Sequence, residues 1–84
     1  MYKVESTKTI IEGKEVDTYG ISNGENFIED ISSNLEFVEA LAYMLNEYDV
    51  SDVHFKDVVE DSIIDEEYFL SIAKESKFKP KNKD

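Results

Sequence analysis

The sequence predicts an α+β fold: a three-stranded antiparallel β-meander followed by two helices packed on one face of the sheet, with a possible third C-terminal helix. Two observations predict it. Residues 2–31 are rich in strand-forming side chains and are interrupted by two turn signals. Residues 32–63 carry apolar side chains at helical spacing, with a start signal before each of two segments. A chain of 84 residues is expected to form one small domain.

The first part of the chain is expected to form strands over residues 2–11, 15–22 and 25–31. Glu12-Gly13 marks the first turn, because glycine can adopt the positive φ that a tight hairpin needs. Asn23-Gly24 is the stronger signal, because both residues tolerate the left-handed backbone of a type I′ turn. The resulting sheet needs a cover on one face, since a small lone sheet is marginally stable in water.

Two details of these strands can be predicted as well. Gly20 inside the second strand is unusual, and it indicates either a β-bulge or the close approach of another backbone. In the third strand, alternation places Phe27 and Ile31 on one face and Ile28 on the other.

The first helix is expected to begin at Ser33, because Ser33 and Glu36 have the spacing of a capping box. Its polar row is narrow, so more than half of this helix should be buried. The residues that recur at helical spacing are Leu35, Val38, Leu41, Ala42, Leu45 and Tyr48.

The second helix is expected to begin after Ser51 as N-cap, with Asp52 in its first turn. Val50 and Phe55 have the spacing of a hydrophobic staple, which fixes how the chain enters the helix. One face is apolar and the opposite face is charged, so one side should pack and the other should meet water. The corner at residues 47–50 is short, so the two helices should be neighbours.

After Ile63 the pattern is compatible with a third helix that Asp65 caps and that runs to about Lys77. Ile64 and Phe69 repeat the staple spacing. Residues 1–77 would then form the domain, and residues 78–84 a charged flexible tail. The predicted core comprises Val4, Tyr19, Ile21, Phe27, Ile31, Leu35, Val38, Leu41, Leu45, Phe55, Val58, Val59 and Ile63.

Charge is the strongest compositional feature, with a net charge of −11 at pH 7. Residues 1–73 hold 18 of the 20 acidic residues and only four of the nine lysines. Such a surface should repel nucleic acid phosphates and anionic lipid. There is no arginine to bind a phosphate with two parallel hydrogen bonds. No apolar run approaches the ~20 residues of a membrane span, and no signal segment is expected.

No catalytic motif is present, so we expect no enzyme and no cofactor. Without cysteine there is no disulfide, thiolate metal site or thiol nucleophile. His54, Asp57 and Asp61 share one side of the second helix and could in principle hold a divalent metal. That spacing matches no established metal motif, so a structural role for His54 is favoured.

Several short stretches resemble a family of small uncharacterised proteins from clostridia and related Firmicutes. The resemblance covers about residues 2–63 and rests on Tyr19-Gly20-Ile21, Asp30-Ile31-Ser32, Leu45-Asn46, and His54 followed by Asp57 to Asp61. It implies a bacterial, cytoplasmic protein and no particular reaction. The segment after Ile63 departs from the family pattern, so a third helix would be a local addition.

The function expected from these observations is a non-catalytic protein-interaction or regulatory module. The alternative is an acidic nucleic-acid mimic that blocks a nucleic-acid-binding partner, which would need carboxylates spaced like phosphates. In both cases the candidate partner-binding residues are Asp52, Asp57, Glu60 and Asp61 on the second helix, and the third helix is the alternative contact surface. The partner is expected to be a protein, without direct nucleic acid or membrane binding. Open sheet edges leave both a monomer and a homodimer as expectations.

Overall fold

A computed structural model, which describes residues 1–75, confirms the α+β fold. The strands are β1 (Lys3–Ile11), β2 (Lys14–Ser22) and β3 (Phe27–Ser32), and the helices are α1 (Leu35–Glu47), α2 (Asp52–Ile63) and α3 (Glu66–Glu75). All strand pairs are antiparallel in the order β1-β2-β3, so β1 and β3 are the edges. Helix α3 confirms the third helix that the sequence left as a possibility. Residues 76 and 77, predicted to end it, and the predicted tail 78–84 lie outside the described residues.

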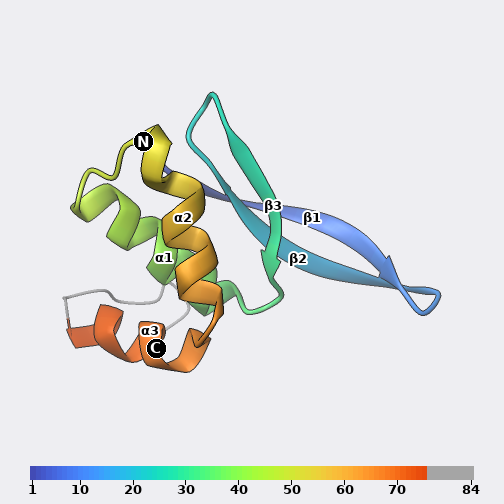
Figure 1. Cartoon of the computed structure of the whole chain (residues 1–84). Helices are drawn as coiled ribbons and strands as arrows, with labels where there is room; N and C mark the ends of the chain where they lie inside the picture. Colours follow the sequence, from blue (N-terminus) through green and yellow to red (C-terminus); the bar gives the residue numbers. More distant parts are fainter. Residues whose placement is uncertain (76–84) are drawn as a thin grey trace.

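The β1–β2 hairpin is longer than the helical layer that covers the sheet. Figure 1 shows its turn end projecting away from the helices, and Ile10 and Ile11 near that turn are exposed. Glu12 and Gly13 have φ of 52° and 79°, as expected for a tight I′ turn. The helices pack against the other end of the sheet, where α1 contacts all three strands and α2 contacts β3.

The connection between β2 and β3 is not the predicted type I′ turn at Asn23-Gly24. Only Gly24 has a positive φ, at 96°. The loop spans four residues, and the Asn23 amide donates to the Asn26 carbonyl at 3.0 Å. The Asn23 side chain also accepts from the backbone amides of Glu25 and Asn26 at 3.0 and 2.8 Å. Asn23 thus closes the loop as an Asx turn, an alternative open to any asparagine.

Gly20 fulfils both predicted roles, since it lies at a bulge and at a close backbone approach. The register between β2 and β3 shifts between Tyr19 and Ile21. A Cβ on Gly20 would collide with the carbonyl oxygen of Ile28 and lie 2.9 Å from the Cα of Glu29. Only a residue without a side chain allows β3 to pass this close.

The predicted faces of β3 are wrong. Ile28 packs against the core and Ile31 is buried, whereas Phe27 is 42% exposed. The reason is Asp30, whose φ of 54° breaks the strict alternation of the strand. Three β3 residues stand opposite a single β2 residue at this point, because Tyr19 pairs with Ser32 and Ile21 pairs with Ile28.

The first helix begins one residue later than predicted. Asn34, not Ser33, is the N-cap of α1, and its side chain accepts from the Phe37 amide at 3.2 Å. Serine and asparagine are about equally good caps, so two adjacent candidates could not be separated by type. The remaining helix starts agree with prediction. Ser51 is the N-cap of α2, although its side chain makes no capping hydrogen bond, and Asp65 accepts from the Tyr68 amide at 3.1 Å.

A Schellman motif forms the corner between α1 and α2. The Val50 amide donates to the Leu45 carbonyl at 3.0 Å, and the Asp49 amide donates to the Asn46 carbonyl at 3.2 Å. Asp49 has a φ of 51°, the left-handed conformation that glycine usually supplies at this position. Val50 and Phe55 both belong to the core packing, as the predicted staple requires.

The core lies between the sheet and helices α1 and α2. Its buried members are Tyr2, Ile21, Ile31, Phe37, Val38, Leu41, Ala42, Leu45, Phe55 and Val59. Most of the predicted core is confirmed. Six of the 13 residues of α1 are buried and five more are half-buried, so slightly less than half of this helix is fully buried. Phe27 and Ile63 are not core residues, because they are 42% and 40% exposed. Leu35 is half-buried and belongs to neither core cluster.

Helix α3 packs on α1 and forms a second, smaller apolar cluster with it. Ala40 and Ala73 are both fully buried, which brings the two helices close together. The rings of Phe37 and Phe69 lie edge to face, 5.7 Å between centroids. Ile64 is 84% exposed, so its predicted staple with Phe69 is wrong, and Phe69 packs against α1 instead.

Candidate functional site

The four carboxylates predicted to bind a partner are all exposed on α2, but they have three different surroundings. Asp52, at the start of the helix, accepts a hydrogen bond from the Asn23 side chain of the β2–β3 loop. Glu60 lies 3.8 Å from Lys56 and lines a groove against β3. Asp57 and Asp61 lie outside that groove and outside the polar pocket at the start of α2.

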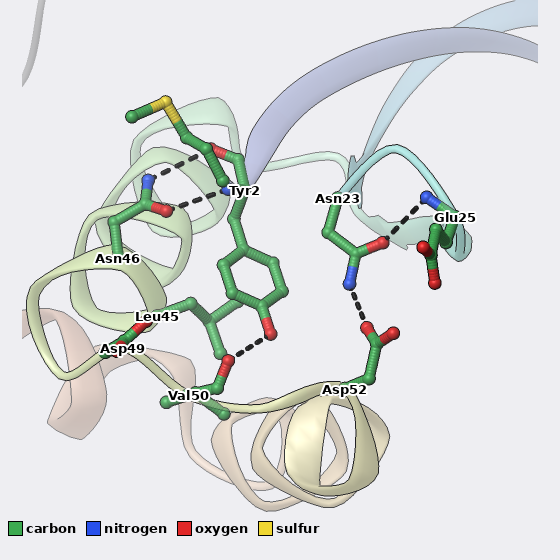
Figure 2. Close-up of a pocket in the computed structure, with 9 residues that line it drawn as sticks. Tyr2, Asn23, Glu25, Leu45, Asn46, Asp49, Val50 and Asp52 are labelled. Atoms are coloured by element: carbon green, nitrogen blue, oxygen red, sulfur yellow. Dashed lines mark hydrogen bonds between the residues drawn. The ribbon is translucent and has the colours of Figure 1, made fainter.

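The polar pocket lies where the start of the chain, the β2–β3 loop and the α1–α2 corner meet (Figure 2). It has a volume of about 270 Å³. Asn46 holds the backbone of Tyr2 on one side, and the Tyr2 hydroxyl donates to the Val50 carbonyl at 2.5 Å. On the other side, Asn23 bridges from its own loop to Asp52.

The polar groups of this pocket are used to hold these three segments together. Burial raises the pKa of the Tyr2 hydroxyl above its ordinary value, the Asn23 side chain opposes this, and the carboxylates of Asp52 and Asp49 add to the rise. The hydroxyl therefore stays protonated and can donate to Val50. Among residues 1–75, no buried side-chain nitrogen or oxygen lacks a hydrogen-bond partner. The hydrogen bonds of Tyr2, Asn23 and Asn46 join these three segments, so we assign these side chains a structural role.

His54 lies exposed in the first turn of α2. Its backbone amide donates to the Ser51 carbonyl at 3.0 Å, as expected at a helix start. Within the described part of the chain, no three or more histidine, aspartate or glutamate side chains are grouped so that they could hold a metal ion.

The second hollow is a groove between β3 and α2 with a volume of about 460 Å³. Its apolar lining comes from both elements and includes the exposed side chains of Phe27 and Ile63. The full lining is Phe27, Ile28, Glu29, Asp30, Ile31, Lys56, Val59, Glu60 and Ile63. The volume falls in the range of small binding sites.

The lining of the groove combines apolar side chains with acidic ones. Glu29, Asp30 and Glu60 supply three carboxylates, against the single ammonium group of Lys56. Of the four predicted carboxylates, the structure therefore brings only Glu60 to the groove. Sequence reasoning missed Phe27 and Ile63, because it assigned both to the core. The adjacent acids Glu29 and Asp30 in a short strand were the available signal.

The fold and this groove define a small acidic α+β domain with a mixed apolar and acidic surface between an edge strand and a helix. The chain belongs to the family of unknown function DUF6514, whose family model matches residues 1–65. The matched region ends at Asp65, the N-cap of α3, so α3 follows it. No curated protein and no solved structure matches the chain. None of the helices in residues 1–75 has the length and apolar character needed to cross a bilayer.

Proposed function

We propose that this domain is a non-catalytic protein-interaction module that binds a basic protein through the groove between β3 and α2. The observation that supports it is the exposure of Phe27 and Ile63 in a hollow that Glu29 and Glu60 also line. Apolar contact provides affinity when it is buried by a partner, and the carboxylates favour a partner of opposite charge. We place the module in the bacterial cytoplasm, as the family resemblance implies.

The net charge of the chain also favours a basic partner. A molecule with a charge of −11 attracts basic partners over a distance and speeds their association. The exposed carboxylates Asp57 and Asp61 contribute to this long-range attraction from outside the groove. In this proposal, the groove makes the contact and the remaining acids of α2 assist the encounter.

The test is differential capture from an extract of the source organism, read by quantitative mass spectrometry. The groove variant is Glu29→Lys combined with Glu60→Lys. The matched control is Asp57→Lys combined with Asp61→Lys, which makes the same change in net charge beside the groove. A partner should be captured by the wild type and by the control, and lost by the groove variant.

Two results would contradict the proposal. If both double variants lose capture of the partner equally, the acidic surface acts through its net charge alone and the groove makes no specific contact. Full capture by both would remove the β3–α2 groove from the interaction. For a captured partner, the groove variant should also bind more slowly at low ionic strength and show a flatter salt dependence.

The acidic nucleic-acid mimic is the second candidate, and the exposed row of Asp57, Glu60 and Asp61 on α2 is the observation that favours it. The pairing of Glu60 with Lys56 and the apolar Phe27 weigh against it, because a phosphate backbone offers neither feature. The same capture experiment separates the two. A mimic should lose a nucleic-acid-binding partner with Asp57→Lys and Asp61→Lys, and added DNA or RNA should displace that partner.

A further inference from the structure

We propose that the β3–α2 groove binds an extended basic segment of the partner as a fourth strand, paired with the open edge of β3. This inference rests on the proposed function and specifies how the partner binds. Three observations support it: the residues that line the groove, the edge of β3 that pairs with no other strand among the described residues, and the position of the carboxylates.

The residues that line the groove indicate that it follows the edge of β3. Its lining includes Phe27, Ile28 and Glu29, three consecutive residues that precede the break in alternation at Asp30. Successive strand side chains point to opposite faces of a sheet, so a hollow over one face would be lined by alternate residues. Consecutive residues can share a hollow when it follows the backbone edge. A segment lying there would meet the backbone of β3.

The edge of β3 is open to pairing. In residues 1–75, β3 pairs with β2 on one side and with no strand on the other. An edge strand presents amide and carbonyl groups that another chain can use, which is the basis of β-strand addition. Six residues, the length of β3, are within the usual length of a sheet strand. Helix α2 would cover one side of the added strand with Ile63, which is 40% exposed.

The charges select which segment can bind. Glu29 and Asp30 lie on the edge strand itself, and Glu60 lines the same groove from α2. A second copy of β3 paired at this edge would bring like charges together, which is destabilising, and each chain carries −11. A segment that alternates lysine or arginine with apolar residues would place its cations near these carboxylates.

The other edge of the sheet is a poorer candidate. Strand β1 carries Lys3 and Lys8, and lysine is a residue that edge strands use to prevent pairing. Its turn end lies away from the helices, so an added strand there would lack a helical cover (Figure 1). Strand β3 contains no lysine.

The experiment uses the full chain and a fluorescent peptide of alternating lysine and valine, seven residues long in this design. Two further peptides carry backbone N-methyl groups, one at the odd and the other at the even positions. In an added strand only alternate amides point at β3, so one methylated peptide should lose binding and the other should keep it. Each lost hydrogen bond should weaken binding about tenfold. Amide exchange should slow at Phe27–Ser32 of β3 when the unmethylated peptide is bound.

Each contrary outcome has a distinct meaning. Strand addition is wrong if both methylated peptides bind as well as the parent peptide. If the Glu29→Lys, Glu60→Lys variant then still binds the parent peptide weakly, the groove remains the binding surface. Slowed exchange at β1 instead of β3 also overturns the inference. Failure of the parent peptide to bind, or equal binding by a peptide with glutamate in place of lysine, rules out a basic strand. A concentration-dependent dimer seen in sedimentation without peptide would identify a second copy as the occupant.

Discussion

The side chain of Asn46 holds both backbone polar groups of Tyr2. The Tyr2 amide donates to Asn46 Oδ1 at 2.8 Å, and Asn46 Nδ2 donates to the Tyr2 carbonyl at 3.0 Å (Figure 2). An asparagine in the last turn of α1 thus pairs with the residue that precedes β1. This contact joins positions 44 residues apart and closes the domain at its N-terminal end.

Replacing Asn46 should therefore destabilise the domain. We expect Asn46→Ala to lower the free energy of unfolding by about 1–3 kcal/mol, because it leaves two partly buried backbone groups without a partner. Asn26→Ala, on an exposed loop residue, is the control and should cost under about 0.5 kcal/mol. Urea unfolding of both variants measures the difference. Equal stability of the two variants would contradict the role of Asn46.

The raised pKa of Tyr2 predicts a loss of stability at high pH. Its folded pKa lies above the ordinary value of 10.0, so the folded state retains the proton more strongly than the unfolded state. This contribution is complete below about pH 10 and is lost as the pH rises through the folded pKa. Tyr2→Phe cannot lose a proton here, so its stability deficit relative to the wild type should shrink above pH 10.

At neutral pH, Tyr2→Phe should cost about 1 kcal/mol through the lost hydrogen bond to Val50. Tyr48→Phe is the control, because Tyr48 is exposed and should contribute little to stability. Denaturant unfolding at neutral and alkaline pH measures both effects. A deficit of Tyr2→Phe that stays constant across this range would show that Tyr2 titrates alike in both states.

Gly20→Ala should be more damaging than Gly24→Ala, although only Gly24 has a positive φ. At Gly24 a methyl group meets open space, so the cost is backbone strain of about 1–2 kcal/mol. At Gly20 it meets the backbone of β3, which cannot move aside without breaking the β2–β3 pairing, and overpacking of this kind costs about 3 kcal/mol or more. Thermal unfolding of the two variants should rank them in this order. The reverse order would mean that β3 can shift freely.

Phe55→Ala should be among the most damaging single changes. Phe55 is 2% exposed, and its ring lies edge to face with Tyr2 at 4.8 Å between centroids. Removal of such a ring costs roughly 3–5 kcal/mol, a large part of the ~5–15 kcal/mol that stabilises a typical domain. Val53→Ala on the same helix is the control, since Val53 is exposed. A loss under about 1 kcal/mol for Phe55→Ala in denaturant unfolding would place Phe55 outside the core.

The candidate site was only partly predictable from the sequence. Glu60 could be found, because charge and helical spacing placed it on an exposed face of α2. Phe27 and Ile63 could not, because their residue types indicate burial, and their exposure depends on how β3 and α2 lie against each other. Asp52 was expected to face a partner, but Asn23, 29 residues away in the sequence, already binds it.

Local chemistry and periodicity alone determined the order of the elements, the bounds of the helices within a few residues, and most of the core. These features depend on neighbours a few positions apart, which a sequence displays directly. Gly20 was recognised as a special position for the same reason, since glycine in a strand conflicts with its surroundings.

Only the tertiary structure decided the faces of β3, the use of Asn23 and Asn46, and the groove. Asp30 adopts a left-handed conformation so that Ile28 and Ile31 can both pack toward the core, and this leaves Phe27 outside. Asn46 meets Tyr2 because the sheet and α1 bring distant positions together. Such contacts depend on how completed elements pack, and a polar side chain with several available partners does not indicate in advance which one it will bind.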